Sequence, residues 1–258
     1  MNASGVLAIP PELGYWSPCL VAEAVGQLAA WSAMARADFQ LRPLAGIAGE
    51  VRIGSDAAPG AEIDLRVEIE HSDAQAVAYG GSASIDGTSV LELDRCLGPM
   101  FPMTDYDDPD ALRARFSEIC GTGEPADRFE RLQRAPMTIV DHDPGRRVRA
   151  TLAIPENAAF FADHFPRRPV YPATLLLDHQ IELALGLAAD LVATGDDRRP
   201  AIGRVTNAKM RAFVLPGQTV EIEAEVKSSD EREARLALTA GAAGTRVSTA
   251  RAEVRVGE

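Results

Sequence analysis

Two long stretches of the chain are apolar on nearly every helical face. They cover about Cys19–Ala35 and Ala173–Val192, and each follows a proline, Pro18 or Pro172. Proline is favoured in the first turn of a helix, and a helix that is apolar all round must be wrapped by other structure. The pattern therefore predicts two long buried helices.

Shorter segments with strand-like patterns follow each of these helices. Apolar and polar residues alternate clearly through the segment Val220–Val226, and a period of two predicts a strand with one buried face. Helices that are each followed by a run of strands predict an α+β fold. The expected strands are Ala48–Ile53, Glu62–Glu70, Ala76–Ile85 and Ser89–Cys96 in the first half, and Arg204–Phe213, Thr219–Lys227, Ala234–Ala240 and Arg246–Val256 in the second.

The two halves share the order and the spacing of their signals. Gly217, in a Leu-Pro-Gly turn, lies 157 positions after Gly60, in an Ala-Pro-Gly turn. The same separation joins Gly46 to Gly203. A chance match of Pro-Gly turns is the alternative, but the shared order of helix, turn and strands favours a duplicated unit.

This duplication predicts three regions along the chain. The first unit spans 1–98, a turn-rich linker with a short helix near Pro109–Ile119 spans 99–134, and the second unit spans 135–258. The second unit has extra front strands around Thr138–Val140 and Arg147–Ile154. The first unit has no clear counterpart to them, because only 17 residues precede Pro18.

Composition narrows the class of protein. The net charge of −12 over 258 residues argues against a general nucleic-acid surface, and docking of an acidic partner would need a local basic patch. The three cysteines are widely spaced, so neither a disulfide framework nor a zinc site is expected. The start of the chain has no basic segment, and no window reaches the roughly 18 apolar residues of a membrane span. We expect a cytoplasmic protein that does not enter a membrane.

One segment carries a specific motif. Residues 160–173 read Phe-Phe-Ala-Asp-His-Phe-Pro-Arg-Arg-Pro-Val-Tyr-Pro-Ala and lead directly into the second helix, where Asp178 follows His164 by 14 positions. This pattern resembles the β-hydroxyacyl-[acyl-carrier-protein] dehydratases, whose motif is His-Phe-Pro-Gly-x-Pro-x-x-Pro-Gly followed by an acidic residue. The resemblance covers about Met137–Val256, with the first half as a degenerate copy. It implies a double hotdog fold, in which two antiparallel sheets each wrap around a long buried helix.

The motif departs from the family pattern at two glycine positions. Arg167 and Ala173 stand where the family usually has Gly. The second departure matters more, because the family uses the backbone N–H at that position to bind the thioester carbonyl. A Cβ on Ala173 could crowd the acyl chain, although the N–H itself is retained.

The resemblance implies reversible dehydration of a β-hydroxyacyl thioester to a 2-enoyl thioester. His164 would be the base, since an imidazole accepts and returns protons near neutral pH. A carboxylic acid in an apolar environment would protonate the leaving hydroxyl, and N–H groups at a helix start, near Cys19, would polarise the carbonyl. Because the family builds its site across two units, the favoured acid is Glu23 of the first unit, in a Glu-Ala-x-x-Gln sequence. Asp178 is the alternative acid, and otherwise lies in a second site that has no histidine.

Several further residues have a functional and a plain interpretation. Phe165, Pro172, Ala173 and Cys19 are expected to line the substrate, although the Cys19 thiol can equally be ordinary packing. Arg167 and Arg168 could contact the phosphopantetheine phosphate or an acidic carrier, or form a solvated charge pair. The carboxylates of Glu23 and Asp178 could be structural hydrogen-bond anchors. The histidines expected to be structural or solvated are His179, His71 and His142.

The implied substrate is an acyl chain on the phosphopantetheine of an acyl carrier protein, in fatty-acid or polyketide-type biosynthesis. No metal or organic cofactor is expected, because the thioester itself acidifies the proton to be removed. Three alternatives remain: double-bond isomerisation, thioester hydrolysis, and a non-catalytic role as an acyl-binding or partner subunit of a synthase. A fused pair of units could act as a monomeric pseudo-dimer or as a homodimer.

Overall fold

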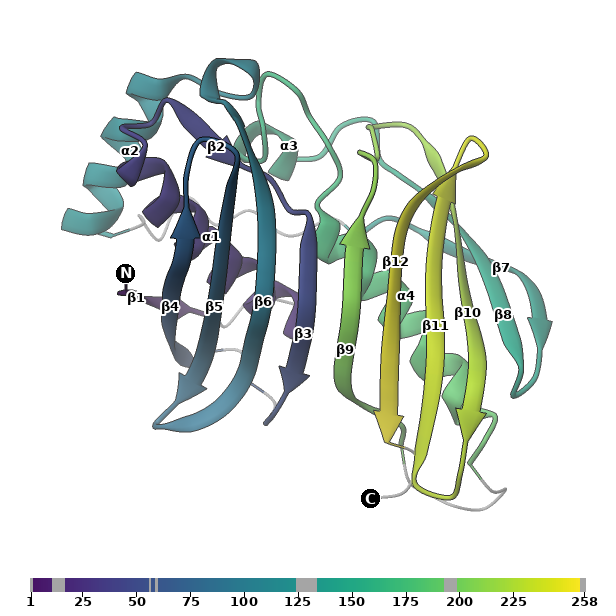
Figure 1. Cartoon of the computed structure of the whole chain (residues 1–258). Coiled ribbons are helices and arrows are strands. Elements are labelled where there is room, and N and C mark those ends of the chain that lie inside the picture. The colour runs from purple at the N-terminus through teal and green to yellow at the C-terminus, as the bar shows by residue number, and fades with distance from the viewer. Residues whose placement is uncertain are drawn as a thin grey trace.

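The computed structural model describes residues 2–10, 17–55, 57–58, 60–123, 134–192 and 199–255. The described chain forms a twelve-stranded antiparallel sheet in the order β1-β4-β5-β6-β3-β9-β12-β11-β10-β8-β7, with β2 paired to β6 off this path (Figure 1). The strands are β1 (Asn2–Ala8), β2 (Leu41–Pro43), β3 (Ile47–Ile53), β4 (Glu62–Ser72), β5 (Ala76–Ile85), β6 (Thr88–Pro102), β7 (Met137–Asp143), β8 (Arg147–Ala153), β9 (Ala201–Met210), β10 (Thr219–Ser229), β11 (Glu233–Ala242) and β12 (Thr245–Arg255).

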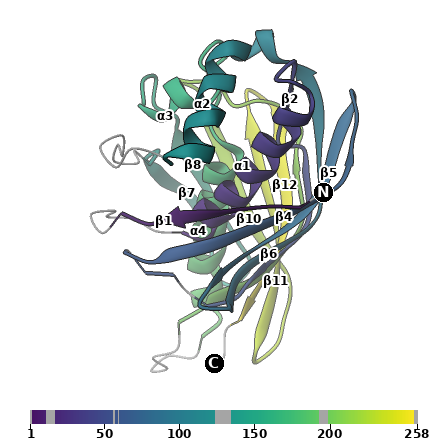
Figure 2. The same ribbon diagram turned by 90° about the vertical axis from the view of Figure 1, so that its left-hand side faces the viewer.

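Both long helices lie on the same side of this sheet (Figures 1 and 2). The first, α1 (Pro18–Arg36), packs mainly on β4 and β5, and the second, α4 (Ala173–Ala189), packs mainly on β10 and β11. The two helices also contact each other. The shorter helices are η1 (Met103–Asp105), α2 (Pro109–Gly121) and α3 (Phe160–Asp163).

The strands of the two halves are displaced by a constant interval. Strands β10, β11 and β12 each begin 157 positions after β4, β5 and β6, respectively. The halves meet where β3 pairs with β9, for example Val51 with Val205. The sequence predicted two sheets that continue side by side, and in the structure β3 and β9 join them edge to edge into one sheet.

The first half also has a front strand, so the expectation that it lacks one was wrong. Strand β1 pairs with β4, with Gly5 opposite Leu65, as β8 pairs with β10, with Ala150 opposite Ile222. The alternation in β1 is hard to recognise in the sequence, because its Asn-Ala-Ser-Gly start consists of small or polar residues.

Helix α1 approaches β5 closely because a glycine faces it there. A Cβ on Gly81 would lie 2.5 Å from Cγ1 of Val25 and 2.9 Å from the carbonyl oxygen of Arg66. Gly186 on α4 is exposed, and a Cβ there would meet nothing within 4 Å. No helix among the described residues is long and apolar enough to cross a membrane.

These two glycines give a matched test of the packing. We expect Gly81→Ala to lower the free energy of unfolding by about 1–3 kcal/mol, because the backbone of β4 cannot move aside cheaply. Gly186→Ala should instead raise it by about 0.5–1 kcal/mol, since alanine is the better helix former. Denaturant melts of both variants measure these changes, and a Gly81→Ala variant as stable as the wild type would contradict the close approach.

Candidate active site

The motif histidine caps the short helix α3 and is held by its own loop. The His164 N–H donates to the carbonyl of Phe160 at 2.8 Å, and Nδ1 lies 3.1 Å from the carbonyl oxygen of Val170. A carbonyl can only accept, so Nδ1 carries a proton in this pair. In the neutral ring, Nε2 then carries the free lone pair that a base needs.

The next residue gives this loop its shape. Phe165 has φ of 62°, in the left-handed region that bulky side chains rarely adopt. It is buried, and its ring packs edge-on against Tyr106 with the ring centroids 5.2 Å apart. Backbone strain of this kind costs about 1–3 kcal/mol and persists only when the surrounding structure imposes it.

The carboxylate of Glu23 comes from the other half of the chain. It lies on α1, where Oε1 accepts from Gln27 Nε2 and Oε2 accepts from Thr174 Oγ1, each at 2.7 Å. Thr174 is in the first turn of α4, so its hydroxyl fixes the start of α4 against Glu23. Each carboxylate oxygen retains a lone pair for a further partner.

The pKa of His164 is influenced by charged groups from the other half of the chain. Burial lowers the pKa of His164 below its ordinary value, and the positive charge of Arg42 acts in the same direction. The negative charge of Glu23 and the hydrogen bond to Val170 raise the pKa in part. The result is an imidazole that stays neutral near neutral pH with a carboxylate from the other half close by.

Asp178 has a different environment. It is buried, 5% exposed, where Oδ1 accepts from the Ser17 hydroxyl and Oδ2 pairs with Arg134 at 3.0 Å. Arg134 also pairs with Glu182 at 2.6 Å. No pattern in the sequence predicted this pairing. Asp178 is therefore held in an ion pair with Arg134, at the end of the expected linker.

The start of each long helix donates a hydroxyl hydrogen bond to a carboxylate on the other helix. Ser17, the N-cap of α1, donates to Asp178 of α4, and Thr174 of α4 donates to Glu23 of α1. The two hydrogen bonds are therefore reciprocal between the helices. The loop before α4 supplies His164, whose imidazole is influenced by the charge of Glu23.

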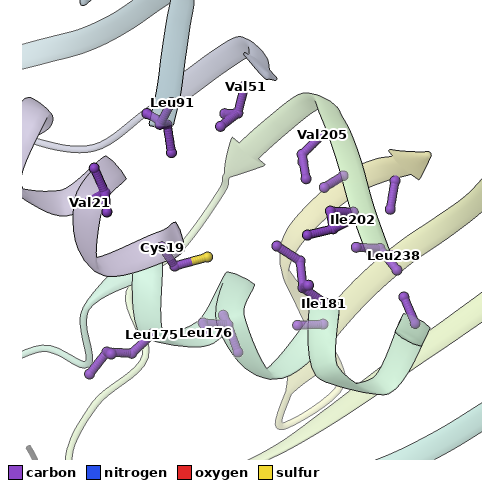
Figure 3. Close-up of a cluster of buried hydrophobic side chains, with 14 of the residues drawn as sticks. Cys19, Val21, Val51, Leu91, Leu175, Leu176, Ile181, Ile202, Val205 and Leu238 are labelled. Atoms are coloured by element: carbon purple, nitrogen blue, oxygen red, sulfur yellow. The ribbon is translucent and has the colours of Figure 1, made fainter. Parts of the chain in front are cut away.

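The expectation that N–H groups near Cys19 polarise a carbonyl is not supported by the structure. Pro18 has no N–H, and the Cys19 N–H donates to Ser17 Oγ at 3.1 Å. Burial, with the charge of Asp178, raises the pKa of the Cys19 thiol far above its usual range. Figure 3 shows the Cys19 sulfur among buried apolar side chains between the two helices, so this thiol is a packing group.

The start of α4, unlike the start of α1, has no side-chain cap on its first backbone N–H groups. Its N-cap is Pro172, which has no side chain that can accept a hydrogen bond from the first turn. The first N–H groups of a helix have no intrahelical partner. The N–H of Ala173 is therefore the first N–H of α4 and has no side-chain cap. The next residue, Thr174, contacts Glu23, so this N–H lies near that carboxylate.

The motif arginines are engaged by neighbouring groups. Arg167 donates to the Thr104 carbonyl at 3.0 Å and pairs with Asp108 at 3.1 Å, and both side chains of this pair are about half exposed. The guanidinium of Arg168 lies over the rings of Tyr106 and Phe213, 5.8 and 5.1 Å from their centroids.

The other three histidines pair with groups outside the His164 loop. His179 is buried beside Arg134 and Glu182, and burial lowers its pKa. His71 is exposed and contacts Asp73, and His142 pairs with Asp190 at 2.7 Å on the surface. Among the described residues, no group of three or more His, Cys, Asp or Glu side chains is arranged to hold a metal ion.

A surface hollow adjoins the histidine loop. It has a volume of about 410 Å³, and its lining includes Glu156, Phe161, Pro169 and Pro216. Phe161 and Pro169 flank His164 in the sequence, so this hollow borders the segment that carries the motif.

Comparison with known proteins agrees with the motif. Residues 141–250 match the family model described as ApeI-like, ApeI dehydratase. The 3-hydroxyacyl-[acyl-carrier-protein] dehydratase FabZ of Clostridium acetobutylicum is 31% identical over 97 residues, which cover 36% of this chain and 68% of the relative. The FabZ of Rickettsia rickettsii is also 31% identical over 97 residues, covering 36% of this chain and 67% of the relative. The chain belongs to the hotdog-fold dehydratase family.

Solved structures agree on the fold of this dehydratase-family chain. A putative oleoyl thioesterase from Lactobacillus plantarum has a TM-score of 0.66 at 12% identity, over 100% of this chain and 97% of its own. The 12:0-ACP thioesterase from Umbellularia californica has a TM-score of 0.60 at 13% identity, over 98% of this chain and 94% of its own. At these identities the likeness shows the hotdog fold alone. The dehydratase family model includes His164 and Asp178, whereas Glu23 lies outside its match.

Proposed function

We propose that this protein dehydrates β-hydroxyacyl thioesters to 2-enoyl thioesters, and that His164 and Glu23 form the site. The observation that carries the proposal is the loop of the family motif, in which Nδ1 of His164 donates to Val170 and leaves Nε2 free. Glu23 from the other half supplies a carboxylate close enough to influence the imidazole. The established family membership supports the same chemistry.

His164 and Glu23 each carry out one of the two proton transfers. Nε2 of His164 removes a proton from the carbon next to the thioester carbonyl, and the electron pair of that C–H bond forms the new double bond. The bond from the β-carbon to its hydroxyl breaks, and the leaving oxygen becomes water by taking a proton that the Glu23 carboxyl group holds in the substrate complex. A proton then passes from the imidazolium to the solvent while Glu23 is reprotonated, which completes the cycle.

Negative charge develops on the thioester oxygen as the proton leaves. We propose that the N–H of Ala173, at the start of α4, stabilises this oxygen, in place of the N–H near Cys19. The positive end of the helix dipole acts in the same direction. The contact between Thr174 and Glu23 supports this assignment, because it holds the same helix turn beside the acid.

We also propose that the fold is a double hotdog with one competent site. The units would span 1–98 and 135–258, with 99–134 as the linker. The constant interval of 157 positions between corresponding strands supports a duplication. The pairing of Asp178 with Arg134 supports a second, closed site, since its carboxylate already has a cationic partner.

The acyl chain would be carried on the phosphopantetheine of an acyl carrier protein, in fatty-acid or polyketide-type biosynthesis. Both FabZ relatives are named for an acyl-carrier-protein substrate. Arg168, whose guanidinium lies over two aromatic rings, is the more available of the two motif arginines for a phosphate, because Arg167 is paired with Asp108.

The pH dependence of the reaction follows from the state of His164. Its neutral form is the active base, and burial lowers its pKa. We therefore expect kcat/KM to rise with pH and to reach its plateau below the ordinary histidine range near 6.5. Initial rates from about pH 4.5 to pH 8 measure this limb, and an apparent pKa above 7 would contradict the assignment.

The proposed activity is tested by following both possible products from the same substrates. 3-Hydroxyacyl thioesters of several chain lengths are supplied on carrier protein and on pantetheine, and enoyl thioester and free thiol are both quantified. Enoyl formation without thiol release is expected. Thiol release would indicate thioester hydrolysis, and tight binding without any turnover would indicate an acyl-binding subunit; either result would overturn the proposal.

A further inference from the structure

The linker region places a compact group of side chains against the histidine loop. Tyr106 is 1% exposed, its ring packs on Phe165, and its carbonyl accepts the N–H of Arg167 at 3.1 Å. These two contacts join the segment after η1 to both residues that flank Pro166. The loop of the catalytic histidine is therefore supported from outside its own unit.

Arg42 completes this support from the first half. It lies on β2, is 7% exposed, and pairs with Asp107 at 3.0 Å. Its guanidinium lies over the ring of Phe165, with Cζ 4.5 Å from the centroid. A buried guanidinium is stabilised when it contacts both a carboxylate and the face of an aromatic ring. Arg42 is therefore held between Asp107 of the linker and Phe165 of the loop.

The position of Phe165 explains why such support is needed. Its left-handed backbone turns the chain so that the next residues run back toward Tyr106, while Nδ1 of His164 faces Val170. The ring of His164 also contacts the ring of Phe165, with centroids 4.3 Å apart. A displacement of Phe165 would therefore displace the imidazole directly.

We propose that Arg42, anchored by Asp107, is a positioning residue that fixes His164 through Phe165. The inference rests on the proposed dehydratase function for its catalytic consequence, but the contact between Arg42 and Phe165 is independent of it. The groups that face His164 from the neighbouring elements are Glu23 on α1, Arg42 on β2 and the Val170 carbonyl in the loop. Of these, Arg42 alone is cationic.

Removal of the Arg42 charge should change the titration of His164 in one direction. The positive charge of Arg42 lowers the pKa of His164, so Arg42→Met should raise it. We expect the titration midpoint of His164 to move upward relative to the wild type. Histidine NMR of the full chain measures this shift, with the His164 signal assigned by its loss in a His164→Asn variant and with His179 as the internal reference.

Arg113 provides a matched control. Its guanidinium lies 5.5 Å from the centroid of Phe39 and pairs with Asp38, so Arg113→Met also deletes a cation over an aromatic ring, but on α2. Arg113→Met should leave the His164 titration and kcat unchanged. Arg42→Met should lower kcat by about ten- to a hundredfold with little change in KM, because the base is misplaced and the substrate contacts remain.

The outcomes separate the two proposals. If Arg42→Met has the same His164 titration midpoint and the same kcat as the control Arg113→Met, the positioning role is overturned. If Arg42→Met does not fold, Arg42→Gln keeps a hydrogen-bond donor for Asp107 and carries the same expectations. A wild-type protein without turnover would refute the dehydratase proposal alone, since the NMR shift would still decide whether Arg42 acts on His164.

Discussion

Replacing His164 with alanine is expected to lower kcat/KM for a 3-hydroxyacyl thioester by about 10²- to 10⁴-fold. The other described histidines pair elsewhere, His71 with Asp73, His142 with Asp190 and His179 with Glu182, so we expect no other imidazole to take over the proton transfer. The variant loses one hydrogen bond to Val170, which costs about 1 kcal/mol, so it should remain folded. Steady-state kinetics on carrier-bound and pantetheine substrates, with a thermal melt, measure both effects.

His142 supplies the control for this deletion. It is a surface histidine paired with Asp190, outside the motif segment, and His142→Ala should retain the wild-type rate. Equal activity of the His164 and His142 variants would show that the motif histidine does not carry the chemistry.

Replacing Glu23 with glutamine is expected to lower kcat by about 10²- to 10³-fold, because the amide cannot protonate the leaving hydroxyl. Glutamine is nearly isosteric and its oxygen can still accept from Thr174, so the start of α4 should stay in place. The measurement is kcat at saturating substrate, together with a melt to show that the fold is retained.

The matched change at Asp178 should have the opposite profile. Asp178→Asn removes the buried charge that faces Arg134 at 3.0 Å, while Glu182 still pairs with Arg134, so we expect a loss of about 1–3 kcal/mol in stability and a kcat within severalfold of the wild type. If Asp178→Asn abolishes turnover while Glu23→Gln does not, the acid is Asp178 and the assignment across the two halves is wrong.

The sequence predicted those features that depend on local patterns. The prolines before the two apolar stretches predict helices whose observed starts are Pro18 and Ala173, and the Pro-Gly turns give the interval that the strands follow. The His-Phe-Pro segment identified the loop that carries His164. In each case a short stretch of chain contains the physical reason for its own structure.

The features that were missed depend on contacts between distant segments, or on small residues. Arg134 and Asp178 are 44 positions apart, and no pattern in the sequence pairs them. Arg42 meets Phe165 only because β2 and the loop are brought together by the whole sheet. The Cys19 N–H is different, since the sequence Ser17-Pro18-Cys19 could have been recognised as an N-cap followed by a first-turn proline.

The most direct test of the central claim follows the proton that His164 transfers. Crotonyl-pantetheine is incubated with the protein in deuterated water, and the product is examined by NMR and mass spectrometry. The account predicts 3-hydroxybutyryl-pantetheine with one deuterium at the carbon next to the carbonyl, formed by the wild type and not by His164→Ala. Release of free thiol without that deuterium, or equal labelling by the His164→Ala variant, would contradict it.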